Sequence, residues 1–151
     1  MTLSRRVDQR RIALGSSVIT VVASPDQTGG RYSLYLIEMP PRGGGAAPHL
    51  HHRFTESFTV LTGTVTLYDG ASWLGASAGD HLVVPERVVH GFRNDTDAPA
   101  TLLMMSTPGA RREDYFEELT EIVQERRELT PEQWTAFFAR HDQVMVPATS
   151  G

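Results

Sequence analysis

Residues 43–63 read GGGAAPHLHHRFTESFTVLTG, and His49 and His51 within this stretch are separated by one residue. Side chains alternate between the two faces of a β-strand, so on a strand these two imidazoles point the same way, whereas His52 points the other way. They would lie about 6–7 Å apart along the strand, close enough to chelate one metal ion. Pro48 stiffens the entry to this strand and lowers the entropy lost when the ligands are fixed.

Glu56 begins the second half of the same stretch, and alternation places it on one face with Phe58 and Val60. An ionised carboxylate on such an apolar face is costly to bury unless it meets a cation. Taken alone, Glu56 could instead pair with Arg53. A metal ion held by the two histidines would equally supply the missing positive charge.

A second stretch, residues 79–94, reads GDHLVVPERVVHGFRN and repeats this pattern. His90 shares a strand face with Phe92, so it is another polar group that points into an apolar interior. A lone strand histidine is usually hydrogen-bonded or at the surface. Three imidazoles and one carboxylate that all point inward are hard to bury without a metal, and the joint pattern therefore predicts a metal site.

Short apolar runs separated by turn residues make up the first two-thirds of the chain. Strands of about 4–8 residues at near-regular spacing indicate an all-β sandwich or barrel. Asp69-Gly70 predicts a hairpin turn, because both residues tolerate positive φ. The strand–helix–strand alternation of a doubly wound α/β sheet is missing from the sequence. The predicted strands cover residues 18–22, 32–39, 58–61, 64–68, 81–84, 88–92 and 101–105.

The last third has helical periodicity instead. Apolar residues recur on one face and charges on the other, which predicts a helix over about residues 111–127. The apolar residues of this stripe are Tyr115, Phe116, Leu119, Ile122 and Val123. A second helix over about 131–142 is predicted by the N-cap Thr130, by Pro131 at the first helical position and by the capping-box residue Gln133.

One face of this second helix carries the aromatic residues Trp134, Phe137 and Phe138, followed by His141. Such a stripe could line a ligand pocket, but a stripe of this kind more often packs on a sheet, which is our interpretation here. We place His141 near the last-turn dipole of the helix and do not expect it to bind a metal.

Composition narrows the possible functions. The 151 residues are the size of one ordinary domain, and the formal charge of −4 gives no reason to expect a nucleic-acid or membrane partner. The absence of cysteine excludes disulfide scaffolds, cysteine-based zinc fingers, iron–sulfur clusters and thiol catalysis. With 40% hydrophobic and 21% charged residues, the chain reads as a soluble globular protein.

Ser4-Arg5-Arg6 precedes a moderately apolar stretch over residues 12–23, and paired arginines before such a stretch also occur in twin-arginine export signals. This stretch is interrupted by Gly15 and is rich in β-branched residues, and no A-x-A cleavage site follows it. We interpret it as a strand and expect a cytoplasmic protein. No run reaches the roughly 18 apolar residues that a membrane-spanning helix needs.

These two histidine-containing stretches resemble the two motifs of the cupin superfamily. The first motif, G-x5-H-x-H-x3/4-E-x6-G, is matched by Gly43, His49, His51, Glu56 and Gly63. The second, G-x5-P-x-G-x2-H-x3-N, is matched by Gly79, Pro85, His90 and Asn94. Arg87 stands where the family usually has glycine, so we expect that turn either to differ in conformation or to accept a right-handed residue. The resemblance covers about residues 40–106.

This resemblance implies a single cupin domain over residues 1–151, with a jelly-roll barrel (a double-stranded β-helix) over about 12–107 and two C-terminal helices. It implies that one divalent transition metal ion (Fe, Mn, Ni, Co, Cu or Zn) is bound, with Glu56 able to act also as a catalytic base. The implied metal ligands are His49, His51, Glu56 and His90. The expected substrate-pocket residues are Tyr35, Phe58, Val60, Phe92 and Met104. His52 and His81 lie off the ligand face.

Three functions are compatible with such a site. The first is a dioxygenase similar to the quercetin-dioxygenase-type cupins, acting on a small aromatic or enolic substrate. The second is a non-oxidative isomerase, cyclase or decarboxylase that uses the metal only to polarise a carbonyl. The third is a protein that binds a small molecule without turnover. We also expect a homodimer, since barrels of this family commonly pair through edge strands.

Overall fold

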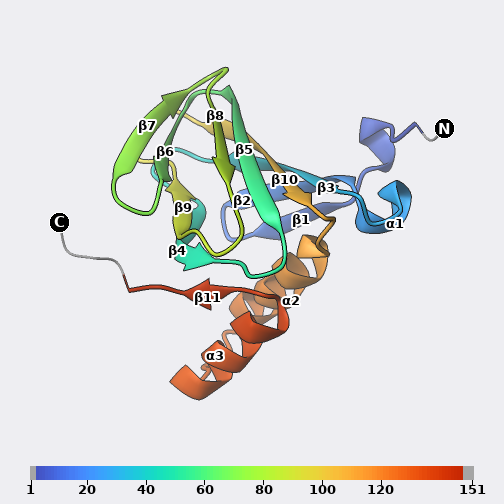
Figure 1. Ribbon diagram of the computed structural model, residues 1–151, viewed down its shortest axis with the longest axis vertical. Coiled ribbons are helices and arrows are strands. Elements are labelled where there is room, and N and C mark those ends of the chain that lie inside the picture. Colours follow the sequence, from blue (N-terminus) through green and yellow to red (C-terminus); the bar gives the residue numbers. More distant parts are fainter. Residues whose placement is uncertain (1–2, 148–151) are drawn as a thin grey trace.

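The computed structural model describes residues 3–147, and its strands form two antiparallel sheets (Figure 1). The six-stranded sheet consists, in spatial order, of β1 (Arg11–Leu14), β2 (Ser17–Ala23), β3 (Ser33–Met39), β10 (Ala100–Thr107), β5 (Thr55–Thr62) and β8 (His81–Val84). The five-stranded sheet consists of β11 (Val144–Met145), β4 (Gly45–Leu50), β9 (His90–Arg93), β6 (Thr64–Tyr68) and β7 (Trp73–Ser77). This is the predicted jelly-roll barrel.

The core lies between the two sheets, where alternate side chains of each strand point inward. Along β3, Ser33, Tyr35, Ile37 and Met39 are buried and the residues between them are half-exposed, as expected for a strand with one covered face. The Asp69-Gly70 turn joins β6 to β7, and the Asp69 carboxylate accepts hydrogen bonds from the backbone of the next residues. The predicted hairpin is therefore confirmed.

Three strands that the sequence did not predict as separate strands, β1, β7 and β11, all lie at sheet edges. The strand predicted to carry His49 and His51 is β4, but it ends at Leu50, just before His51. Edge strands are short and partly exposed, so their apolar alternation is weak. Residues 12–23 are two strands rather than one, because Gly15 has φ 58° and turns the chain between β1 and β2. β9 starts at His90, two residues later than the predicted run at 88–92.

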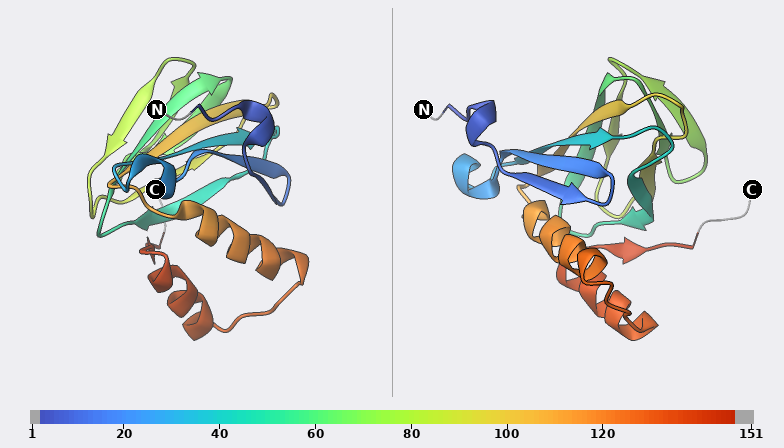
Figure 2. Two further views of the ribbon diagram at one scale, coloured as in Figure 1. Left: turned by 90° about the vertical axis from the view of Figure 1, so that its right-hand side faces the viewer. Right: turned by 180° about the vertical axis from the view of Figure 1, so that it is seen from behind.

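Helices α2 (Arg112–Gln124) and α3 (Pro131–Arg140) lie against one end of the barrel (Figures 1 and 2). The capping box of α3 is confirmed, because Thr130 Oγ1 accepts from the Gln133 amide at 3.3 Å and Gln133 Oε1 accepts from the Thr130 amide at 2.9 Å. Both helices end earlier than predicted, and Arg126 and Asp142, just beyond them, have positive φ. Two short helical segments, η1 (Arg6–Asp8) and α1 (Pro25–Thr28), precede the barrel strands β1 and β3.

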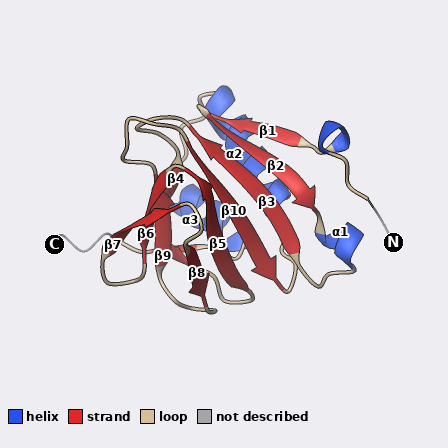
Figure 3. Ribbon diagram, turned by 90° about the horizontal axis from the view of Figure 1, so that it is seen from above, coloured by secondary structure: helices blue, strands red, loops and turns tan. Residues whose placement is uncertain are grey.

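The aromatic face of α3 packs against α2, so the expectation that it packs on a sheet is wrong. Phe137 is buried, with its ring centroid 5.5 Å from that of Tyr115 on α2. Seen from above, the helices lie beneath the strands, with α2 under β1 and β2 (Figure 3). No helix within residues 3–147 has the length and apolar character needed to cross a membrane.

Candidate metal centre

Four buried polar residues from both sheets meet inside the barrel: His49, His51, Glu56 and His90. His49 lies near the end of β4, directly opposite His90 at the start of β9, and His51 follows one residue after β4. Glu56 enters from β5 in the other sheet. Each residue offers one possible ligand atom, a ring nitrogen of a histidine or a carboxylate oxygen of Glu56. These four atoms all lie within 4.8 Å of one another. The structure thus brings together all four predicted ligands.

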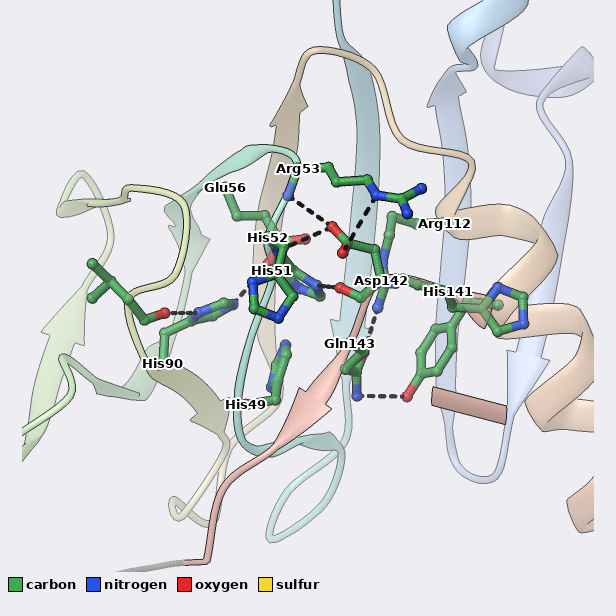
Figure 4. Close-up of polar contacts among 12 residues, drawn as sticks. His49, His51, His52, Arg53, Glu56, His90, Arg112, His141, Asp142 and Gln143 are labelled. Atoms are coloured by element: carbon green, nitrogen blue, oxygen red, sulfur yellow. Dashed lines mark hydrogen bonds and ion pairs between the residues drawn. The ribbon is translucent and has the colours of Figure 1, made fainter. Parts of the chain in front are cut away.

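Backbone carbonyl oxygens fix the orientation of all three imidazoles, and Figure 4 shows the contact of His51 with Asp142. The Nδ1 atoms of His49, His51 and His90 lie 2.7, 2.6 and 3.1 Å from the carbonyl oxygens of Ala47, Asp142 and Val88, respectively. A carbonyl oxygen only accepts, so each Nδ1 carries a hydrogen and donates it. In the neutral rings the lone pair is then on Nε2, as in histidines whose other nitrogen binds a metal.

The inner atoms of this cluster are poorly satisfied by the protein itself. Glu56 Oε2 lies 3.0 Å from His90 Nε2 and 3.5 Å from His51 Nε2. Among the described residues, His51 Nε2 and Glu56 Oε1 are buried without a hydrogen-bond partner. Imidazole lone pairs that face a buried carboxylate repel it unless a cation lies between them. The donor set therefore fits a divalent metal ion.

Protonation in the cluster also suits metal binding, which needs neutral histidines and an ionised carboxylate. Burial, together with repulsion from His90 and His51 when those rings are protonated, lowers the pKa of His49 to about 3. Burial alone would raise the pKa of Glu56, but hydrogen bonds and positive charge from His51 and His90, which those rings supply when Nε2 also carries a proton, outweigh it and hold that pKa well below its usual value. His49 is thus neutral and Glu56 ionised at neutral pH.

The segment between α3 and β11 supports the cluster from outside. The Asp142 carbonyl oxygen accepts the hydrogen of His51 Nδ1, and its carboxylate Oδ2 accepts the amides of His52 and Arg53 at 3.1 and 2.9 Å. Arg53 lies beside Asp142, with Nε 4.0 Å from Oδ1, so the alternative Glu56–Arg53 pair is not what the structure shows. Sequence reasoning missed Asp142, because it is 91 residues from His51.

Other histidines lie outside the cluster. His52 and His81 are exposed, and His81 Nδ1 is 2.8 Å from Thr59 Oγ1 at the surface. His141 Nε2 lies 2.8 Å from Glu118 Oε2, between α3 and α2. All three side chains therefore lie outside the interior of the barrel.

Arg87 keeps the backbone conformation that glycine usually provides, with φ 66°. Both expected alternatives, a turn of different conformation and a right-handed residue, are therefore wrong. The Arg87 amide donates to the His51 carbonyl oxygen at 2.6 Å, which ties this turn to the ligand segment. The arginine side chain is exposed, so the left-handed conformation is tolerated at a strain of roughly 1–2 kcal/mol.

A cavity of about 50 Å³ reaches His49 and Glu56 from the side of α2. Its other walls are Leu14, Gly45, Ala46, Phe92 and Met104 from the barrel, Arg112, Tyr115, Phe116 and Leu119 from α2, and Gln143. A second cavity of about 130 Å³ shares four of these residues and extends between β1–β2 and β9. Its lining is Leu14, Ser17, Ile19, Ile37, Gly44, Gly45, Phe92 and Phe116.

Two of the predicted pocket residues, Phe92 and Met104, line the cavity beside the cluster. Tyr35, Phe58 and Val60 line neither of these two cavities and are buried in the core. Phe58 packs behind the histidines, with its ring centroid 5.8 Å from that of His90. The hydroxyl of Tyr35 instead donates to Glu113 Oε2 and lies 3.0 Å from the Ala110 carbonyl oxygen, which attaches β3 to the start of α2 and the segment before it.

The wall that α2 contributes was not predicted as part of the site. Its signal was present in the sequence, because Arg112 stands three, four and seven residues before Tyr115, Phe116 and Leu119 and so shares their helix face. An arginine at the start of an apolar helix face indicates that its charged side chain is buried together with that face. What the sequence could not show is which surface this stripe covers.

The fold is a jelly-roll barrel with a cluster suited to a divalent metal ion, and comparisons with known proteins agree with this class of fold. The Cupin domain family matches residues 35–106. Quercetin 2,3-dioxygenase from Bacillus subtilis (strain 168) is 30% identical over 86 residues, which cover 57% of this chain and 25% of that protein. The chain thus spans about a quarter of the length of that relative.

Solved structures resemble the fold at low sequence identity. A sugar phosphate isomerase from Silicibacter pomeroyi has a TM-score of 0.62 at 21% identity, covering 70% of this chain and 75% of that one. The polyketide cyclase RemF from Streptomyces resistomycificus has a TM-score of 0.61 at 19% identity, covering 72% and 80%. From the motifs, the fold and the matching domain family, the chain belongs to the cupin superfamily.

Proposed function

We propose that this cupin is a metal-dependent enzyme that oxygenates a small aromatic or enolic substrate. The metal part rests on one observation: three carbonyl oxygens hold the Nδ1 hydrogens of the histidines, so that three Nε2 atoms converge with the buried carboxylate of Glu56. The oxygenase part is supported by the similarity to quercetin 2,3-dioxygenase over 86 residues.

When bound, a divalent ion of this kind acts as a Lewis acid toward a substrate oxygen and offers open coordination positions. The chain's own residues do the rest. Phe92, Met104 and Phe116 form apolar walls that keep water from the reacting atoms. Glu56 Oε1, buried and without a partner among the described residues, is placed to accept a proton from a substrate hydroxyl.

The volume of the cavities beside the cluster limits the size of the substrate. The two adjoining cavities, about 50 and 130 Å³, fall short of the ~300 Å³ or more that is typical for drug-sized ligands. A substrate with one ring, or a short enolic acid, matches this space better than a flavonol of three rings.

A second candidate is non-oxidative chemistry: isomerisation, cyclisation or decarboxylation. It is supported by the donor set, since three imidazoles and a carboxylate also suit zinc, which has no redox chemistry. A third candidate, a protein that binds a small molecule without turnover, would use the same four clustered residues and the same cavity.

The test starts with metal analysis of protein purified without chelators, followed by reconstitution with single metals. Oxygen uptake is then measured with small catechols, small enols and a flavonol. We expect uptake with a one-ring substrate and a redox-active metal. Turnover supported by zinc alone under argon would instead establish the non-oxidative candidate, and tight metal binding without any turnover would establish the binding protein.

Ligand identity is tested by replacing single histidines. We expect His90→Ala to lose most of the bound metal, because it removes one of four converging donors, whereas His52→Ala keeps wild-type metal content because its side chain is exposed. Metal per chain is measured by elemental analysis after identical purification. Equal metal content in the two variants would contradict the assignment.

A further inference from the structure

Arg112 is a buried cation without a buried anion of its own. Only 4% of its surface is exposed, and no carboxylate oxygen among residues 3–147 lies within 4 Å of its nitrogens. Its Nη1 donates to the His141 carbonyl oxygen at 3.0 Å and its Nη2 to Gln143 Oε1 at 2.7 Å. Both acceptors are neutral, so they orient the guanidinium but leave its charge uncompensated.

One donor of this guanidinium is free. Arg112 Nε is buried and has no hydrogen-bond partner among the described residues. Aromatic packing holds the group in place, since its Cζ lies 4.2 Å from the ring centroid of Tyr115. The nearby buried carboxylate of Glu113 is engaged by the hydroxyl of Tyr35. A fixed, desolvated guanidinium with an open donor is suited to binding an anionic oxygen.

Arg112 lines the same small cavity as His49 and Glu56. If a divalent ion binds as proposed above, Glu56 neutralises only half of its charge, and Arg112 adds a further positive charge to the same buried space. Such an arrangement favours a ligand that brings negative charge with it. The adjoining cavity, which contains Ile19, Ile37 and Phe116, offers an apolar wall for the rest of such a ligand.

We propose that Arg112 binds the carboxylate of the substrate, and that the substrate is a small organic acid with an apolar body and a second oxygen that faces the metal centre. This proposal deepens the proposed function and rests on it for the second oxygen. The carboxylate part depends only on Arg112 and its surroundings.

Two probes of nearly equal shape test the carboxylate part. Salicylate carries a carboxylate beside a phenolic oxygen, and salicylamide carries a neutral amide in its place. We expect the wild-type protein to bind salicylate roughly 10- to 100-fold more tightly than salicylamide, the range expected for a charge-assisted hydrogen bond. Affinities are measured by isothermal titration calorimetry on metal-loaded and on metal-free protein.

Three variants locate the preference. Arg112→Met removes the cation, and Gln143→Glu gives Arg112 an internal carboxylate while keeping the side chain's length; both are expected to erase the preference for salicylate. Arg111→Gln is the matched control, because this neighbouring arginine is exposed and pairs with Asp26, and it should keep the wild-type preference. Circular dichroism shows which variants fold, and Gln143→Glu decides the question if Arg112→Met does not.

Equal affinity of the wild-type protein for the two probes would overturn the proposal, as would a preference that survives in Gln143→Glu or no measurable binding of either probe. Metal content is measured in the same samples. A wild-type protein that binds no metal contradicts the proposed function, while the metal-free titrations still decide on Arg112. The two failures are therefore distinguishable.

Discussion

The three histidines of the centre differ in what fixes their ring orientation. His49 and His90 each donate to the carbonyl oxygen two residues earlier, at Ala47 and Val88, so the local chain sets their tautomer. His51 depends on Asp142, which arrives from the far end of the chain. His51 is therefore the ligand whose orientation is most sensitive to changes outside the barrel strands.

Replacing Arg87 tests directly whether the backbone is strained in the turn that hydrogen-bonds to His51. We expect Arg87→Gly to raise the free energy of unfolding by about 0.5–1 kcal/mol, because the relief of left-handed strain exceeds the extra chain entropy of glycine. Urea unfolding measures the change. Arg93→Gly is the comparison, since that residue lies in β9, and it should be destabilising. A loss of stability in Arg87→Gly would contradict the strain argument.

Among the elements, the connection from α3 to β11 holds the ligand segment in place. Asp142→Gly removes the carboxylate that accepts the amides of His52 and Arg53, while glycine tolerates the φ of 51° at this position. We expect metal affinity to fall roughly 10-fold, as for other groups that orient metal ligands. Competition with a chromogenic chelator measures it. Asp142→Asn retains a side-chain oxygen acceptor and serves as control; unchanged affinity in Asp142→Gly would contradict this role.

Tyr35 joins strand β3 to the start of α2, and its pKa gives a pH test. Burial, followed by the hydrogen bond and charge of Glu113, raises this pKa above the usual value of 10. The folded state therefore keeps the proton that the unfolded chain loses, so this contribution to stability is complete below pH 10 and is lost as the pH rises beyond it.

We accordingly expect the free energy of unfolding of Tyr35→Phe to fall less than that of the wild type as the pH rises above 10. Below pH 10, the free energy of unfolding of the variant should be lower than that of the wild type by about 1–3 kcal/mol, because Glu113 and the Arg112 amide lose a buried partner. Unfolding in urea across this pH range measures both effects. Tyr32→Phe, at an exposed tyrosine, is the control. Parallel pH profiles of Tyr35→Phe and the wild type would refute the prediction.

In the whole molecule, the centre bridges the two sheets. His49 and His90 belong to the five-stranded sheet and Glu56 to the six-stranded sheet, so an ion bound by all of them would cross-link the barrel. We expect a divalent metal at 100 times its Kd to raise the free energy of unfolding by about 2.7 kcal/mol. Urea unfolding with metal or with a chelator measures this difference.

Glu56→Gln should greatly reduce that stabilisation, because the amide keeps the shape but not the charge of the carboxylate, whereas His52→Ala should retain it in full. Equal stabilisation of Glu56→Gln and the wild type would show that the ion binds elsewhere. The homodimer expected from the sequence stays a prediction, which sedimentation velocity can test.

The sequence by itself determined the barrel class, the two C-terminal helices and the four clustered residues. Strand alternation has a period of two, so a short stretch such as residues 56–60 already fixes that Glu56, Phe58 and Val60 share a face. A capping box is equally local, and the start of α3 at Pro131 was therefore predictable. Spacing within two motifs sufficed for His49, His51, Glu56 and His90.

Only the tertiary structure decided what surrounds these residues. The Asp142 carbonyl, the α2 wall with Arg112 and the edge strands β1, β7 and β11 depend on contacts between segments far apart in the chain. Such contacts are set by how the elements pack, and an apolar stripe shows that a helix face is covered but not which surface covers it. The core positions of Tyr35, Phe58 and Val60 follow from the same packing, which fills the space between the sheets with their side chains.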